Sequence, residues 1–298
     1  MFFGMAKTEC DGWMFGDTGA PVSRQSATKL RKKDMSTIHQ PKPLPESLKE
    51  IEALSAPINC RATDYPAGWY IAPHAHNKHQ LIYAVRGVMV VATEGGQWVV
   101  PPTRAIWVLS GVLHEIRCVG EVHMRSLLVR PDAGPKLLDA TQAVGISPLL
   151  RELIRAAQDV QQPYQHNTRD GRLMRLILDE LRALPVLPLH LHMPSDARLA
   201  QICEHLQRRL DDSSTMADWA ERLGVDVKTI QRLFTKETGM TFGQWRQQAR
   251  LLHALELLAT GQKVIDVALA LGYESPSAFA TMFRKQFGQT PSQFFQEL

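Results

Sequence analysis

The chain has 298 residues, of which 44% are hydrophobic and 21% are charged, so a fibrous or intrinsically disordered protein is excluded and two globular domains can be accommodated. The formal charge of +4 is too small for the total alone to indicate a nucleic-acid partner. The sequence lacks a bilayer-spanning apolar run, a secretory signal and a close cysteine pair. We therefore expect a cytoplasmic protein with no membrane partner and no disulfide framework.

Residues 1–50 are rich in Gly, Ser, Lys and Pro, a composition that seldom forms a packed core. We predict a flexible N-terminal arm over this range. The basic run at 31–33 (Arg-Lys-Lys) is interpreted as a solvated tail, with contact to phosphates as the alternative. Met35 is a second candidate for the initiating residue beside Met1, and the sequence leaves both open.

Short apolar runs broken by Gly and Pro follow over residues 51–132, and their β-branched and aromatic content predicts strands. The turn at 94–97 (Glu-Gly-Gly-Gln) predicts a tight hairpin because glycine accepts positive φ. Many short strands at this spacing are typical of a sandwich or a barrel. The predicted strands cover residues 80–85, 88–93, 97–100, 105–109 and 122–129.

Residues 133–184 change to helical periodicity, with helices predicted over 148–157 and 169–184. Leu173, Leu176, Ile177 and Leu181 form an apolar stripe on the second helix. One interpretation is that this stripe covers the β-rich region. The alternative is that it pairs with its own copy in a homodimer.

A proline-rich linker is predicted over residues 185–194 because Pro185 and Pro188 end the helix. His190 and His192 lie in this linker, two residues apart. They are interpreted as part of a strand or a connecting segment without a ligand-binding role.

Two helical modules are predicted in the C-terminal region, residues 195–298. Thr215 followed three residues later by Asp218 resembles a capping box and predicts the start of a helix. Gly224 follows that helix, where a left-handed turn is needed, and Asp226 can cap the next helix. A helix, a glycine turn and a second capped helix are the parts of a helix-turn-helix.

The second module repeats this pattern after a long linking helix, predicted from Thr241 to near Gly261. Gly272 marks the turn, and Ser275 caps a final helix with Pro276 at its first position. One such match could arise by chance. Two in register indicate a DNA-binding protein.

The residues predicted to contact DNA lie on the second helix of each helix-turn-helix module. They occupy the faces of these helices that are not apolar. Arg can hydrogen-bond guanine, and Gln adenine, through two contacts each in the major groove, while the short side chains of the last helix favour phosphate and methyl contacts. Basic and acidic residues are equal in number from residue 194 onward, so the positions of the charges matter more than their sum. A merely solvated helix face is the alternative. The predicted contact residues are Lys228, Thr229, Gln231, Arg232, Lys236, Ser277, Ala278, Thr281, Arg284 and Lys285.

Residues 195–298, including the ending at 287–294, resemble the DNA-binding domain of the AraC/XylS family of transcription regulators. The resemblance implies that the rigid linking helix places the two reader helices in successive major grooves of double-stranded promoter or operator DNA. It further implies contact with RNA polymerase if the protein is an activator. By position, the family's base contacts fall on Lys228, Gln231, Arg232, Ser277, Ala278 and Thr281.

In the β-rich half, His74-Ala75-His76, Gln80 and the later His114 resemble the two motifs of cupins. Side chains alternate along a strand, so His74 and His76 share a face, as two ligands of one metal must. Three imidazoles suit a divalent transition metal such as Zn, Fe, Ni or Cu. Gln80 stands where a metal-binding cupin usually carries Glu, so a metal-free pocket lined by imidazoles is the alternative. The resemblance implies a small-molecule or metal effector in this pocket.

The predicted fold class is α+β with two domains. The first is a cupin-like β-barrel sensor over 51–132 with flanking helices, and the second is all-α with two helix-turn-helix motifs. The predicted function is that of a one-component, sequence-specific transcription regulator without enzymatic activity. The alternative is a cupin-type metal-dependent enzyme fused to DNA-binding modules. Gln80 argues against the alternative because such an enzyme would be expected to keep the carboxylate ligand.

Overall fold

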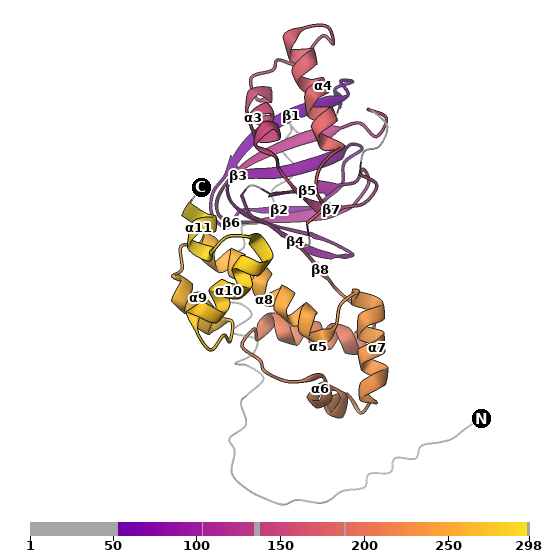
Figure 1. The fold of residues 1–298 in the computed structure, drawn as a ribbon. Helices are drawn as coiled ribbons and strands as arrows, with labels where there is room; N and C mark the ends of the chain where they lie inside the picture. The colour runs from indigo at the N-terminus through magenta and orange to yellow at the C-terminus, as the bar shows by residue number, and fades with distance from the viewer. Residues whose placement is uncertain (1–52, 103, 134–137, 188, 297–298) are drawn as a thin grey trace, which may run out of the picture. The chain divides into compact units, whose positions relative to one another are not determined.

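The computed structural model describes residues 53–102, 104–133, 138–187 and 189–296 (Figure 1). The predicted arm, with its basic run at 31–33 and Met35, lies outside this range. The described residues form an antiparallel sheet followed by helices, which confirms the two-domain α+β class.

None of the described helices combines the length and the apolar character required to cross a membrane.

The β-rich half of the described chain forms one sheet in which every named pairing is antiparallel. Its strands are β1 (Ile58–Tyr65), β2 (Tyr70–His74), β3 (His79–Thr93), β4 (Gly96–Val100), β5 (Arg104–Val108), β6 (His114–Val129), β7 (Gln142–Gly145) and β8 (His190–His192). Thr93 pairs directly with Gly96, so Glu94 and Gly95 form a two-residue turn and the predicted hairpin is confirmed.

The two longest strands, β3 and β6, pair along most of their lengths and form the centre of the sheet. On the other side of β3, β5 pairs with its first half and β4 with its second half. The β3–β6 register shifts around Arg86, next to Gly87, whose φ of 81° allows the chain to bend. A Cβ atom at Gly87 would collide with the backbone of Glu121, so this position requires glycine.

The predicted barrel is corrected to an open sheet. Within the described residues, β1 and β2 each pair only with β6, β7 pairs with β5, and β8 pairs with β4. These pairings do not join the outer strands into a ring. The alternation of apolar side chains predicts a buried face, but closure depends on which distant strands meet at the edges. β8 comes from the predicted linker and adds a strand beside β4.

Helices α3 (Pro148–Ala157) and α4 (Arg169–Leu181) lie over one face of the sheet (Figure 1). Ser147 caps α3 through the backbone N–H of Leu150, as expected for a helix with proline in its first turn. On α4, Ile177 and Leu181 are buried in the core beneath, whereas Leu176 is 41% exposed. The stripe therefore covers the sheet with most of its residues.

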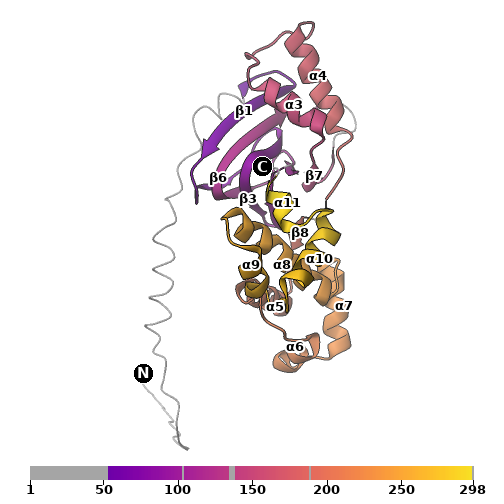
Figure 2. The same ribbon diagram turned by 60° about the vertical axis from the view of Figure 1, so that its left-hand side comes forward.

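The C-terminal half consists of helices that are capped largely as the sequence predicts. They are α5 (Ala197–Arg208), α6 (Met216–Leu223), α7 (Val227–Thr238), α8 (Phe242–Ala259), α9 (Val264–Ala270), α10 (Pro276–Phe287) and α11 (Pro291–Gln296). In Figures 1 and 2, α6 and α7 lie toward one end of α8, and α9 and α10 lie toward the other. Capping boxes at Thr215 and Thr241 are both present.

His190 on β8 stacks on Trp98 of β4, with ring centroids 4.0 Å apart and an interplanar angle of 4°. Burial, with the neighbouring His192 second, lowers the pKa of His190 to about 4. The neutral imidazole is therefore the form that the folded sheet favours.

We expect His190 to make folding less favourable as the pH falls from about 6.5 to about 4. In this window the unfolded chain binds a proton on the imidazole and the folded chain does not, so the free energy of unfolding becomes smaller as the pH falls. Urea titrations at about pH 7.5, 5.5 and 4.5 should show a weaker pH dependence for His190→Phe than for the wild type. Equal dependence in the two proteins would contradict this role.

Candidate DNA interface and metal site

The first reader helix, α7, begins at a cap that the sequence specifies. Gly224 adopts the left-handed conformation with φ of 62°, and the Asp226 carboxylate accepts a hydrogen bond from the Thr229 backbone at 3.0 Å. Ile230 and Phe234 are then buried. The opposite positions of the helix are left exposed to solvent.

Lys228, Gln231 and Arg232 line one groove, of about 620 Å³, beside α7. The start of α8, at Phe242 and Gly243, forms part of the same groove. The sequence predicted the three polar residues but not the groove, because α8 follows in the chain and reaches them only after folding. Thr229 and Lys236, the other predicted contacts on α7, are exposed outside the groove lining.

The second reader helix, α10, is built in the same way. Ser275 accepts a hydrogen bond from the backbone of Ala278 at 3.2 Å, and Pro276 occupies the first turn. Phe279 and Phe283 are fully buried. The remaining predicted contacts are exposed, namely Ser277, Ala278, Thr281, Arg284 and Lys285. The ion pairs recorded among the described residues do not include Arg284 or Lys285, so both charges can face phosphates.

Helix α8 lies between the two modules and contacts α5 and α7 of the first, and α9 and α11 of the second. Trp245, Leu252 and Leu255 are almost completely buried along its length. A helix packed on several sides is held more rigidly than an exposed linker. The relation between the two reader helices therefore depends on this packing.

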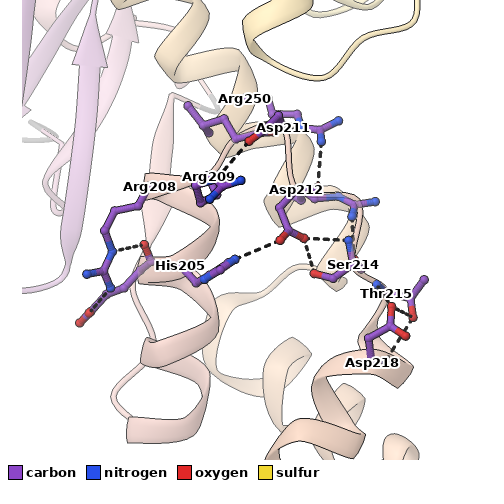
Figure 3. A network of polar contacts seen from close by, with 12 residues as sticks. His205, Arg208, Arg209, Asp211, Asp212, Ser214, Thr215, Asp218 and Arg250 are labelled. Carbon is purple, nitrogen blue, oxygen red and sulfur yellow. Dashed lines mark hydrogen bonds and ion pairs between the residues drawn. The ribbon is translucent and has the colours of Figure 1, made fainter. Parts of the chain in front are cut away.

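A polar network that the sequence does not reveal holds the α5–α6 loop against α8 (Figure 3). Arg250 on α8 donates to the carbonyl oxygens of Leu210 and Asp212 at 2.7 and 3.1 Å. The Asp212 carboxylate accepts from the Ser214 backbone at 2.7 Å and lies 3.0 Å from His205 Nε2. Partial burial opposes ionisation, but the hydrogen bonds from Ser214 and His205 outweigh it and lower the pKa of Asp212 to about 2. Arg250 and Asp212 are 38 residues apart, so local sequence patterns do not connect them.

In the sheet, the structure brings His74, His76 and His114 together, with candidate ligand nitrogens all within 4.8 Å of one another. His74 ends β2 and His114 begins β6, and the two are directly opposed in the pairing of these strands. Their ring centroids lie 4.3 Å apart. His76 follows β2 in a loop. Its own backbone carbonyl oxygen accepts a hydrogen bond from the Gly111 backbone N–H at 2.8 Å.

Backbone carbonyl oxygens orient two of these imidazoles. His74 Nδ1 lies 2.7 Å from the oxygen of Ala72, and His114 Nδ1 lies 2.9 Å from the oxygen of Val112. A carbonyl oxygen only accepts, so each Nδ1 carries the proton and each Nε2 carries a lone pair. Metal-binding histidines are commonly held by this kind of outer hydrogen bond.

Two of the three imidazoles, those of His76 and His114, favour the neutral form because burial lowers the pKa of each. Burial lowers the pKa of His114 to about 4, and burial together with His74 lowers that of His76 to about 4. Gln80, the fourth predicted residue, is buried on β3 and donates through its amide nitrogen to Ser126 Oγ at 3.2 Å. The same side chain also interacts with His76. His114 Nε2 is buried without a hydrogen-bond partner among the described residues, so one buried acceptor in the cluster lacks a donor.

Comparison with known proteins identifies both halves of the chain. A model of the AraC-like ligand binding domain matches residues 57–228, more than half of the chain, and a model of a helix-turn-helix domain matches residues 219–297. The chain belongs to the AraC family of transcription regulators. Its N-terminal half is therefore a ligand-binding domain, and its C-terminal half is a DNA-binding helix-turn-helix domain.

Two relatives in sequence, NimR and SoxS, agree with this assignment. The chain is 34% identical to the HTH-type transcriptional regulator NimR of Escherichia coli strain K12 over 225 residues, which cover 76% of this chain and 82% of NimR. It is 36% identical to the regulatory protein SoxS of the same strain over 101 residues, 34% of this chain and 91% of SoxS. Among solved structures, apo ToxT from Vibrio cholerae strain SCE256 has a TM-score of 0.34 and 11% identity, covering 81% of this chain and 97% of ToxT.

The roles of the individual residues on α7 and α10 in this regulator remain predictions. We expect Arg232→Ala to weaken specific DNA binding by about 1–3 kcal/mol, because the exposed guanidinium can read a base edge. The measurement is an affinity comparison on DNA segments recovered by genome-wide mapping of bound sites, together with single-base variants of them.

The matched control is Arg155→Ala, which removes an exposed arginine on α3 that pairs with Glu152 at 2.9 Å. It should leave DNA affinity unchanged. If Arg232→Ala lowers affinity for all base variants equally, the side chain contacts phosphate and does not read sequence.

Proposed function

We propose that this chain is a one-component regulator in which His74, His76 and His114 hold a divalent transition metal as part of the effector signal. The observation that carries the proposal is the buried His114 Nε2, an acceptor without a hydrogen-bond donor among the described residues, within a cluster of three imidazoles. A buried acceptor without a donor is unfavourable by about 1–3 kcal/mol, and a cation bound to the cluster would satisfy it. The low pKa values support the same conclusion, because a metal binds the neutral imidazole.

The donor set fits Zn, Fe, Ni or Cu, which imidazole ligands suit. When bound, the ion would supply a Lewis-acid centre with open positions for a further ligand. The chain itself orients two of the ligands through the carbonyl oxygens of Ala72 and Val112 and excludes water by burial. Small-molecule binding in a metal-free pocket is the competing version of the sensor.

A short path leads from this site to the DNA-binding half. His114 is the first residue of β6, and Arg117, three residues later, donates to Glu256 of α8 at 2.6 Å. Trp245 of α8 also donates to the backbone oxygen of His192 on β8 at 2.8 Å. A change at His114 therefore acts on a strand that directly contacts the helix between both reader modules. This is a physical route for coupling two sites.

The length of α8 supports simultaneous binding of the two modules. Its 18 residues span about 27 Å at 1.5 Å per residue, and readers in successive major grooves need to lie about 34 Å apart. Modules packed at the two ends of such a helix reach a comparable separation. We propose that α7 and α10 enter successive grooves of promoter or operator DNA.

The remaining parts of the proposal concern partners and location. We expect the protein to act in the cytoplasm, to contact RNA polymerase if it activates transcription, and to form a homodimer through the partly exposed face of α3 and α4 at Leu149 and Leu176. We also propose that it has no enzymatic activity. The neutral Gln80 in place of a carboxylate and the regulatory relatives support this view over a cupin-type enzyme.

His114→Gln should lower Zn²⁺ affinity by at least about 100-fold, because it removes a ligand oriented by the backbone, and loss of an outer partner alone typically lowers affinity by 10–100-fold. Isothermal titration calorimetry of the full-length protein without a histidine tag measures the Zn²⁺ affinity. His123→Gln is the control, since His123 lies on the same strand outside the cluster. Absence of Zn²⁺ binding by the wild type would overturn the metal version of the sensor.

Arg117→Ala should uncouple the sensor from DNA. If the Arg117–Glu256 pair transmits the signal, the factor by which Zn²⁺ changes DNA affinity should move toward one, from an expected range of about 5–150-fold, while Zn²⁺ affinity stays unchanged. The control is Arg125→Ala. Arg125 lies on the same strand as Arg117, β6, and the change removes its 2.9 Å ion pair with Asp64 of β1. An identical Zn²⁺ effect in Arg117→Ala and the wild type would contradict this path.

A further inference from the structure

The candidate metal site provides no negative charge of its own. The cluster of potential ligands recorded among the described residues consists of three histidines and contains no carboxylate. A histidine that binds a metal does so through a neutral imidazole, and the buried Gln80 on β3 is a neutral amide. A divalent ion held here would therefore keep its full charge of +2 in a buried environment. Such a charge is unfavourable unless a counter-ion accompanies it.

The surroundings of the site increase its positive character. Arg61 on β1 pairs in register with Ser126 on β6, and Ser126 Oγ accepts the hydrogen bond from Gln80. Directly paired residues of neighbouring strands point to the same face of a sheet, so Arg61 lies on the face that carries the site. Arg61 also lies within electrostatic range of His76.

The carboxylate next in sequence does not compensate this charge. Glu115 follows His114 directly, but alternation along β6 directs neighbouring side chains to opposite faces. Its carboxylate accepts a hydrogen bond from the Tyr70 hydroxyl at 2.5 Å. Glu115 is thus engaged on the other side of the strand.

We propose that the ligand completing this site is a small organic carboxylate, which binds the open positions of the metal and provides the negative charge that Gln80 does not. This inference rests on the metal site proposed above and specifies the chemical class of its effector. Carboxylate oxygens are ordinary ligands of the metals that suit three imidazoles. The anion and the metal then raise each other's affinity by the same factor, as linkage requires.

The test uses full-length protein loaded with Co²⁺, whose visible absorption reports its ligands, and compares acetate with its neutral isostere acetamide. Acetate should change the Co²⁺ spectrum and raise Co²⁺ affinity by about tenfold or more, and acetamide should do neither. A spectrum that responds equally to the two compounds, or to neither, overturns the carboxylate inference and leaves the metal site intact. Failure of Co²⁺ and Zn²⁺ to bind overturns both.

Two variants sharpen the test. Gln80→Glu supplies the missing carboxylate, so it should raise Co²⁺ affinity without acetate and reduce the acetate effect by about tenfold. Arg61→Gln should weaken acetate binding severalfold while Co²⁺ alone binds as well as before, with Arg86→Gln, an exposed arginine on β3, as control. Inorganic phosphate is the final arm, and a response to phosphate in place of acetate would overturn the carboxylate class. The wild-type comparison of acetate with acetamide stands even if a variant fails to fold.

Discussion

The burial of α8 is the constraint on which the rest of this regulator depends. Trp245, Leu252 and Leu255 pack along its length against helices of both modules, so the helix cannot shift without disturbing two cores. Its contacts with β6 and β8, through Glu256 and Trp245, attach the same helix to the sheet. Because protein interiors are close-packed, displacement at one contact is transmitted and not absorbed. A single element therefore sets the geometry of DNA reading and its connection to the ligand-binding half.

The sensor half depends on a different balance, between neutral donors and charge. Burial favours the neutral form of His76 and His114, while the same burial makes an uncompensated cation unfavourable. In the metal site that we propose, the neutral amide of Gln80 leaves the negative charge to be supplied by the ligand. The metal would then bind well only together with this ligand, which is a property expected of a sensor and of little use for a permanently loaded cofactor.

The two reader helices are unequal in chemistry although they are built alike. Lys228, Gln231 and Arg232 on α7 share one groove with the start of α8 and can form hydrogen bonds to base edges. On α10, Ser277 and Thr281 are exposed but short. We therefore expect the first helix to discriminate bases and the second to fix position through contacts with the DNA backbone.

The local features follow directly from the sequence, because caps, turns and apolar periodicity act over a few residues. The capping boxes at Thr215 and Thr241, the hairpin at 94–97 and the buried faces of α7 and α10 all follow from neighbours within one or two turns. Other features emerge only in the folded chain: the open edges of the sheet, the pairing of β8 with β4, and the contacts of Arg250 with Asp212 and of Arg117 with Glu256. These contacts join segments tens to more than a hundred residues apart, so no local pattern specifies them, and packing of the whole chain selects which side chains meet.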